Sequence, residues 1–295
     1  PRHAGVPATH LVVGLAPDGG RLAPGIRADL VAAIRSGLNV DSGLHDFLGD
    51  DPEIRLLAER HGVTVRDVRR PPSIARLHFF SGKIEQVESL VIAVLGTDSA
   101  VGKRTTAWML VEALEGAGIC TELVGTGQTA WMQGARFGLV LDSLPNDFVA
   151  GEIEHAVWDA WQDSHPDVIV IEGQGSLMHP AYPGGFEILA AARPGAVIMQ
   201  HAPSRRDYDG FPGYPVAPLE SQIEAVELIS GATVVAVTVN HEHLPVESVA
   251  VACREITAAT GLPAFDVVLQ GADNLVPVVR ELMPGAIAST GNTKP

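Results

Sequence analysis

Cysteine and lysine are scarce in this sequence, and no run of basic or apolar residues is long. The two cysteines, Cys120 and Cys253, do not form a CxxC pair, so we interpret both as reduced core residues. No apolar stretch reaches the roughly 20 residues that a membrane helix needs, and the N-terminal residues lack the pattern of a signal peptide. We therefore expect a cytoplasmic protein with no membrane partner.

Positive charge and aromatic side chains are also in short supply. The formal net charge of the 295 residues is -15, which argues against a nucleic-acid partner because nucleic-acid grooves are basic. Only 5% of the residues are aromatic although 46% are hydrophobic, so valine, alanine, leucine and isoleucine must fill the core. This composition is typical of an α/β protein with buried parallel strands.

Strand and helix patterns alternate in the first 70 residues. We predict a strand that leads into a loop in 10–17, a helix in 25–37, a loop in 38–51, a helix in 52–62 and a strand in 63–68. This is the pattern of the later part of a Rossmann-like α/β unit. Because the sequence starts at Pro1 in the middle of it, we expect the first strands of this unit to be missing.

A proline pair and a loss of periodicity in 69–86 mark the predicted domain boundary. This gives a partial Rossmann-like domain in 1–86 and a second domain in 87–295. Strands and helices alternate again in the second domain, which indicates a parallel sheet covered on both faces. The expected strands are 90–95, 120–125, 167–171, 195–200, 232–239 and 264–268, and the expected helices are 103–117, 147–162, 219–229 and 246–259.

A phosphate-binding loop is the clearest chemical signal. An apolar strand enters a turn with Gly96, five further residues, Gly102 and Lys103, and a helix follows. Backbone N–H groups of such a turn converge at the positive end of the helix dipole and bind phosphate or diphosphate. The predicted ligand-binding residues are Gly96, Thr97, Asp98, Ser99, Ala100, Val101, Gly102, Lys103, Arg104 and Thr105.

Three residues are candidates for the catalytic base. Glu172 ends a buried strand at the edge where α/β sheets bind ligands, and burial there raises a carboxyl pKa. His179 follows in the same glycine-rich stretch, and His201 follows the next predicted strand. The alternatives are a helix cap for Glu172 and structural roles in loops for the two histidines.

Other side chains are candidates for binding a small substrate. Arg205 and Arg206 lie in the long loop after the strand at 195–200, and arginine pairs well with carboxylates. Gln128, Thr129 and Ser176 offer amide and hydroxyl groups. The alternatives are a solvated loop with local Arg–Asp pairs and an ordinary glycine turn.

Two further polar sites carry weaker signals. Asn240 ends a predicted strand, where it is either a base-recognition residue or a turn residue. His241 and His243 form an HxH pair with no third ligand in view, so we predict no metal site.

Several of these motifs resemble known families. "GTDSAVGK" and "IEGQG" are similar to the phosphate loop and to the acidic E-G-x-G element of the dethiobiotin synthetase branch of P-loop proteins. There the carboxylate faces bound magnesium. Together with "GTGQTAWM", "HAPSRRDYDGFP" and "GLNVDSGLHDFLGDDPEI", they resemble the DUF1611 family, which is associated with D-glutamate N-acetyltransferase. This resemblance implies a Rossmann-like N-terminal part and a P-loop C-terminal domain.

The resemblance also implies a function and a donor. We expect an N-acyltransferase that moves an acetyl group from acetyl-CoA, held by its diphosphate, to D-glutamate or a similar amino acid. Arg104 stands where a serine or threonine usually binds magnesium, and direct acetyl transfer needs no metal. Two alternatives stay open. In the first, Thr105 or Thr106 supplies the hydroxyl, and the chain is an ATP-dependent ligase or kinase with Mg-ATP. In the second, it is a nucleotide-binding regulatory module. A homo-oligomer is the expected assembly.

Overall fold

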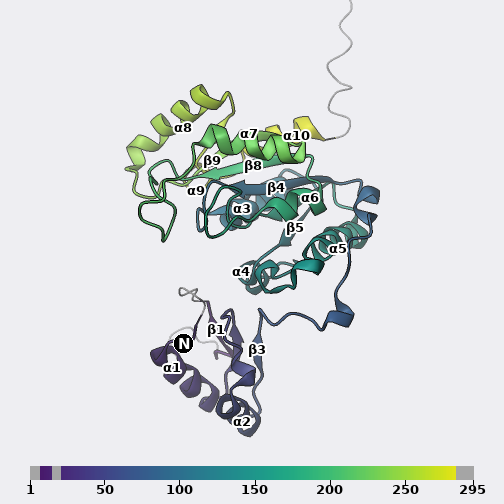
Figure 1. The fold of residues 1–295 in the computed structure, drawn as a ribbon, viewed down its shortest axis with the longest axis vertical. Helices are drawn as coiled ribbons and strands as arrows, with labels where there is room; N and C mark the ends of the chain where they lie inside the picture. Colours follow the sequence, from purple (N-terminus) through teal and green to yellow (C-terminus); the bar gives the residue numbers. More distant parts are fainter. Residues whose placement is uncertain (1–6, 15–20, 284–295) are drawn as a thin grey trace, which may run out of the picture. The chain divides into compact units, whose positions relative to one another are not determined.

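The chain divides into two compact units, and each is described by itself. The computed structural model describes residues 7–14 and 21–283. The first unit contains the described residues up to Arg76 together with 128–134 and 140–144, and the second contains the rest. Figure 1 labels many of their helices and strands.

The first unit contains a three-stranded parallel sheet. Its strands β1 (His10–Val13), β2 (Asn39–Ser42) and β3 (Val65–Asp67) follow one another in the sheet as in the sequence. Helices α1 (Pro24–Arg35) and α2 (Pro52–His61) connect them. The core consists of buried aliphatic side chains, namely Val13, Leu30, Ile34, Val40, Leu44, Leu48 and Ile54. This confirms the Rossmann-like α/β prediction for the N-terminal part.

Local sequence explains where α2 begins and ends. The Asp51 side chain accepts hydrogen bonds from the backbone N–H groups of Glu53 and Ile54, and Pro52 occupies the first turn. Gly62 ends the helix with a left-handed φ of 64°.

The prediction of a loop throughout 38–51 was wrong, because β2 forms there. The strand buries the polar residues Asp41 and Ser42, and the Asp41 carboxylate accepts a hydrogen bond of 2.7 Å from Arg66 on β3. An apolar pattern is therefore absent even though the strand is central.

The second unit is built on a seven-stranded parallel sheet in the order β10-β9-β8-β4-β7-β5-β6. Its strands are β4 (Leu90–Gly96), β5 (Thr121–Gly125), β6 (Phe137–Gly138), β7 (Val168–Glu172), β8 (Ala196–His201), β9 (Thr233–Val239) and β10 (Ala264–Phe265). Its helices are α3 (Lys103–Gly116), α5 (Asn146–Ser164), α6 (Phe186–Ala192), α7 (Leu219–Ser230), α8 (Val246–Thr260), α9 (Val267–Gln270) and α10 (Leu275–Leu282). The parallel-sheet prediction for this domain is thus confirmed.

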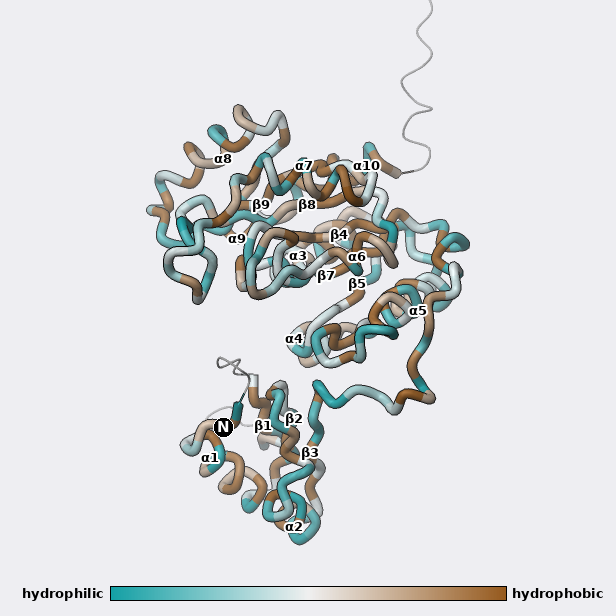
Figure 2. The backbone as a smooth tube through the Cα atoms, in the orientation of Figure 1, coloured by the Kyte–Doolittle hydropathy of each residue, from teal (hydrophilic) through white to brown (hydrophobic). Residues whose placement is uncertain are grey.

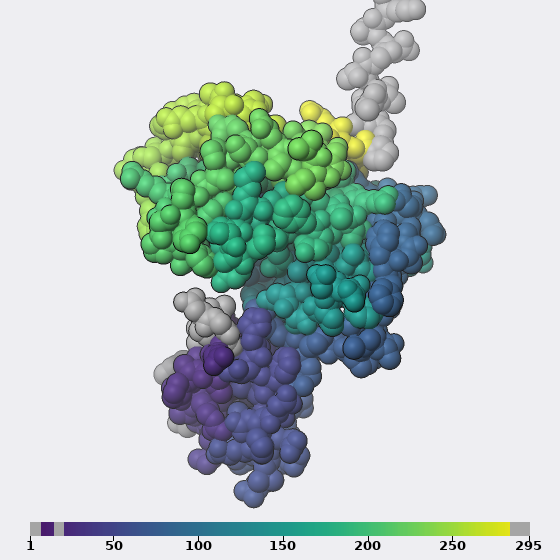
Figure 3. Space-filling model, in the orientation of Figure 1, coloured from purple at the N-terminus to yellow at the C-terminus, as the bar shows by residue number. Residues whose placement is uncertain are grey.

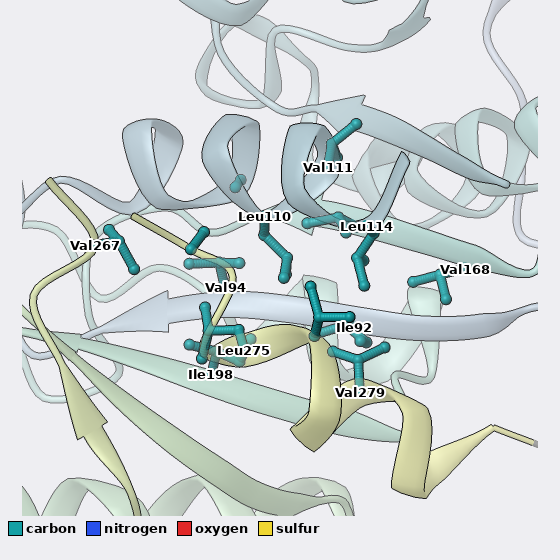
Figure 4. Close-up of a cluster of buried hydrophobic side chains, with 14 of the residues drawn as sticks. Ile92, Val94, Leu110, Val111, Leu114, Val168, Ile198, Val267, Leu275 and Val279 are labelled. Atoms are coloured by element: carbon teal, nitrogen blue, oxygen red, sulfur yellow. The ribbon is translucent and has the colours of Figure 1, made fainter. Parts of the chain in front are cut away.

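The core of this unit lies between the sheet and its helices. Side chains of α3, β4 and α10 meet in one buried cluster that includes Leu110, Ile92 and Val279 (Figure 4). Strands β4, β8 and β9 are mostly hydrophobic in Figure 2. Figure 3 shows the surface of the same face, coloured along the sequence. Among the described helices, none combines the length and apolar composition needed to cross a membrane.

Some predicted elements differ from the structure. The expected strand at 264–268 stops at Phe265, because Asp266 caps α9 by accepting hydrogen bonds from Val268 N and Leu269 N. Helices α6, α10 and α4 (Gln128–Met132), the last in the first unit, were not predicted. Cys253 is buried as expected, whereas Cys120 is exposed just before β5.

Three loops leave the sheet at the carboxyl ends of the neighbouring strands β7, β4 and β8. In the parallel register, Gly96 of β4 pairs with Gln200 of β8, and Val94 of β4 pairs with Glu172 of β7. The strands therefore end together, and the segments that follow them start side by side. We call these segments the phosphate loop (97–102), the glycine-rich loop (173–185) and the arginine loop (202–218).

Candidate functional site

The phosphate loop presents an open helix N-terminus. Helix α3 begins after Gly102, whose φ of 109° favours glycine, and no side chain caps the first N–H groups of the helix. Ala100 also has a left-handed φ of 46°. Uncapped N–H groups at the positive end of a 14-residue helix are suited to binding an anion.

Lys103 is buried beside this loop. Its Nζ atom donates hydrogen bonds to the carbonyl oxygens of Asp98 (2.6 Å) and of Gly175 (2.7 Å). An ammonium group has three donors, so one remains for a ligand. Burial lowers the pKa of Lys103 to about 8, although the nearby carboxylates of Asp98 and Glu172 oppose the shift. A bound phosphate would favour the charged form.

Asp98 connects the phosphate loop to the arginine loop. Its carboxylate is 1% exposed and accepts hydrogen bonds from Arg205 Nη1 (2.8 Å), Ser99 N (2.6 Å) and Asp209 N (3.0 Å). These partners occupy both carboxylate oxygens. In this structure the Asp98 side chain therefore holds loops together, and ligand binding by Asp98 as part of the phosphate loop stays a prediction.

Arg205 also differs from its predicted role. All five of its guanidinium N–H groups donate to acceptors within the protein. They are Asp98 Oδ2, Glu242 Oε2 (from both Nε and Nη2), and the carbonyl oxygens of Ser99 and Ala100. No donor is left for a substrate carboxylate, so we now expect Arg205 to brace the phosphate loop. Its neighbour Arg206 is exposed and has no ion pair among the described residues.

Glu172 lies at the end of β7 with its carboxylate buried. The side chain accepts a hydrogen bond from Thr126 N (3.0 Å), and the residue is 6% exposed. Burial raises the pKa of Glu172, while the bond from Thr126 and the charges of Arg104 and Lys103 oppose the increase. A carboxylate with a raised pKa is suited to accepting a proton.

The hydrogen bonds of His179 fix the tautomer of its neutral ring. Its Nδ1 atom accepts from the backbone N–H groups of Ala181 (3.0 Å) and Tyr182 (2.9 Å), which places the proton of the neutral ring on Nε2. Nε2 lies 3.3 Å from Asp98 Oδ1 but off the direction of a hydrogen bond, so it has no hydrogen-bond partner in the described residues. Burial lowers the pKa of His179. Accepting a proton at Nδ1 would break two hydrogen bonds.

The remaining predicted residues have varied surroundings. His201 Nδ1 lies 3.0 Å from Thr97 Oγ1, and burial lowers the pKa of His201 to about 4. The buried hydroxyl of Ser176 donates to Gln222 Oε1 at 2.8 Å. Gln128 and Thr129 open α4 and belong to the first unit. Their substrate-binding role stays a prediction.

The residues at the expected magnesium position do not fit that ion. Magnesium in P-loop proteins is bound by the hydroxyl that follows the loop lysine, and Arg104 stands there. The hydroxyl of Thr106 is buried and donates to Gln200, which also accepts from Thr238 (2.6 Å). Thr105 is exposed. We therefore expect the phosphate loop to bind its ligand without magnesium.

Sequence reasoning missed several residues that hold the site. The buried side chain of Gln200 connects α3 with β9, the buried side chain of Gln222 cross-links the loops, and Glu242 completes the Arg205 cluster. Asn240, for which base recognition and a turn were the two predicted roles, donates from Nδ2 to the carbonyl of Val101 at 2.9 Å and so braces the phosphate loop. His241 pairs with Asp266 at 2.6 Å. For Gln200, a polar residue near the end of a buried strand was the available signal.

Comparisons with known proteins agree over nearly the whole chain. Residues 78–276 match the family description "Domain of unknown function (DUF1611_C) P-loop domain", and residues 3–71 match "Domain of unknown function (DUF1611_N) Rossmann-like domain". A crystal structure of a DUF1611 family protein from Anabaena variabilis is 30% identical with a TM-score of 0.85. It covers 92% of this chain and 80% of that one.

Two curated relatives carry the name D-glutamate N-acetyltransferase. The protein from Tritonibacter scottomollicae is 35% identical over 275 residues, and that from a Pseudoalteromonas species is 31% identical over 276 residues. Each alignment covers 91% of this chain and 80% of the relative.

Proposed function

Because the chain belongs to the DUF1611 family, we propose that it transfers the acetyl group of acetyl-CoA to the amine of D-glutamate or a similar amino acid. The observation that carries this proposal is the similarity to two proteins named D-glutamate N-acetyltransferase, which extends over 91% of the chain. The acceptor is a small molecule, and we expect the reaction to occur in the cytoplasm.

The donor fits the phosphate loop chemically. Coenzyme A carries a diphosphate, and the uncapped N-terminus of α3 together with Lys103 offers N–H donors and a positive charge. In this use the phosphate loop binds the acetyl donor and does not hydrolyse a nucleotide. The burial of the Thr106 hydroxyl and the presence of Arg104 at the usual magnesium-binding position support this use over the alternative with Mg-ATP.

The reaction itself requires a neutral amine. The amine nitrogen attacks the thioester carbonyl carbon, the C–N bond forms and the C–S bond breaks. Two protons leave the ammonium group, of which one reaches the departing thiolate and the other the solvent. Among the predicted bases, Glu172 is the best suited because its pKa is raised by burial, whereas burial lowers the pKa of both His179 and His201.

The position of Glu172 sets a condition on the donor. The carboxylate lies near Lys103 and Arg104, whose charges act on it, whereas the pantetheine arm separates the thioester of acetyl-CoA from its diphosphate. The arm must therefore fold back over the loop to bring the acetyl group to Glu172. Arg206, exposed on the arginine loop, is the cation that we propose for a carboxylate of the acceptor.

A direct assay tests the function. The purified chain is incubated with acetyl-CoA and D-glutamate, L-glutamate or D-aspartate, and thiol release and the acetylated product are measured. A parallel reaction contains Mg-ATP in place of acetyl-CoA and is analysed for ADP. Thiol release coupled to N-acetyl-D-glutamate supports the proposal. ADP formation that depends on an amino acid, without acetyl transfer, would overturn it in favour of a ligase or kinase.

A further inference from the structure

The residue after the loop lysine is unusual for this fold. In nucleotide-hydrolysing P-loop proteins, a serine or threonine there binds the magnesium ion that neutralises the phosphates. Here the first two residues of α3 are Lys103 and Arg104. The helix therefore starts with two cationic side chains at the end that binds anions.

The buried hydroxyl group nearest to Arg104 does not take over the metal-binding task. Thr106 lies one turn into α3, is 1% exposed, and donates its hydroxyl to Gln200 on β8. Gln200 accepts from Thr238 as well, so the three side chains form a closed network. Because Thr106 is buried beside this network, its hydroxyl oxygen is not accessible to a metal ion in this structure.

Arg104 is free to serve a ligand. It is half-buried, and it makes no side-chain hydrogen bond or ion pair within residues 21–283. This contrasts with Arg205, whose donors are all occupied. The positive charge of Arg104 opposes the rise in the pKa of Glu172 that burial causes. Its charge therefore acts on the carboxylate that would face a metal in the dethiobiotin synthetase branch.

We propose that Arg104 replaces magnesium as the cation that neutralises the diphosphate of the ligand in this phosphate loop. Arginine remains charged at all accessible pH values, and its planar guanidinium can donate two parallel hydrogen bonds to a phosphate. Because the charge is part of the chain, the loop binds its diphosphate without a metal. The inference rests on the proposed function only for the identity of the natural ligand.

The experiment replaces Arg104 and asks whether the loop becomes metal-dependent. Binding of inorganic pyrophosphate and of coenzyme A is measured by isothermal titration, once in EDTA and once with excess Mg²⁺. For the unmodified chain we expect affinities that differ by less than about twofold between the two conditions. Arg104→Thr should weaken binding in EDTA by about 10- to 100-fold, the range for hydrogen bonds to charged groups, and Mg²⁺ should restore much of it.

Two other variants make the result specific. Arg104→Gln has no hydroxyl placed to bind a metal, so it should lose affinity in EDTA and not regain it with Mg²⁺. Arg254→Thr, on the exposed surface of α8, should bind as the unmodified chain does. Circular dichroism and thermal melting show whether each variant folds.

Several outcomes would overturn the inference. They are native binding that requires Mg²⁺, native binding of neither probe, or an Arg104→Thr variant that binds as well in EDTA as the native chain. The outcome of this titration can be distinguished from the outcome of the acetyl-transfer assay. Metal-free pyrophosphate binding through Arg104 without acetyl transfer would refute only the function. Acetyl transfer with an unaffected Arg104→Thr variant would refute only the role of Arg104.

Discussion

Asp98 and Arg205 form a buried ion pair, with 2.8 Å between Oδ2 and Nη1, that joins the phosphate loop to the arginine loop. The two residues are 107 positions apart in the sequence. Arg205 additionally binds two carbonyl groups of the phosphate loop and Glu242. Arg205 thus holds the phosphate loop in its conformation. The same arginine loop carries Arg206, the residue proposed to contact the acceptor.

Removing Arg205 should unfold or loosen the site. Arg205→Ala leaves Asp98 as a buried carboxylate without its cation, and breaking a buried pair in this way costs about 3–5 kcal/mol of unfolding free energy. Denaturant unfolding measures it. Arg205→Lys should recover only part of the loss, because an ammonium cannot supply five donors. A variant as stable as the native chain would show that the cluster does not hold the loop.

Arg206 should behave in the opposite way. Its side chain is exposed and has no ion pair in the described part of the chain, so Arg206→Ala should change the unfolding free energy by less than about 0.5 kcal/mol. If it binds the acceptor, KM for the amino acid should rise at least tenfold, while KM for acetyl-CoA stays the same. Steady-state kinetics with each substrate varied in turn measures both values. An equal rise in both would instead indicate a general role in folding the site.

Glu172 should affect the chemical step. Glu172→Gln should lower kcat by roughly 10²–10⁴-fold, the usual effect of losing a general base, with little change in KM for acetyl-CoA. A variant with native kcat but altered donor binding would show that the carboxylate balances Arg104 and Lys103 and does not take the proton.

The pKa of Glu172 also predicts a pH dependence of stability. Its folded pKa lies above the ordinary value of 4.5, so the folded state binds the proton more tightly than the unfolded state. Stability from this group is therefore present at pH values below 4.5 and is lost as the pH rises through the folded pKa. Relative to the native chain, Glu172→Gln should gain stability between pH 4.5 and 8, as measured by denaturant unfolding across that range.

Lys103 should take up protons when the donor binds. Burial lowers its pKa to about 8 from 10.5, and a bound diphosphate restores the preference for the charged form. At pH 8.5 a large fraction of Lys103 is neutral before binding, so binding of coenzyme A should be accompanied by proton uptake that is much smaller at pH 6.5. Titration calorimetry in two buffers with different ionisation enthalpies measures the uptake. Lys103→Met should abolish it, and uptake that persists in this variant would assign the proton elsewhere.

The framework of the second unit could be predicted because its signals are local. The run from Leu90 to Gly96, the glycine turn and Lys103 specify strand, loop and helix within about 20 consecutive residues. Length and apolar composition identify buried parallel strands in the same way. By contrast, β2 carries Asp41 and Ser42 in its buried positions, and its polar sequence resembles a loop.

The partners within the site could not be predicted from the sequence. A single sequence shows that Arg205 follows a strand end but does not show that its acceptors lie in the phosphate loop. The same holds for Thr106 and Gln200, which are 94 residues apart. Once strand register brings such residues together, hydrogen-bond satisfaction decides which side chains brace the loops and which, like Arg104 and Arg206, are left for a ligand.

The central claim is that the phosphate loop binds the diphosphate of acetyl-CoA. The most direct measurement compares acetyl-CoA with S-acetylpantetheine, which has the same thioester and no diphosphate, in the native chain and in Lys103→Met. Lys103→Met should lower kcat/KM for acetyl-CoA by about 10- to 100-fold and leave the much lower kcat/KM for S-acetylpantetheine within about threefold. An equal loss for both donors, or no loss for acetyl-CoA, would contradict the account.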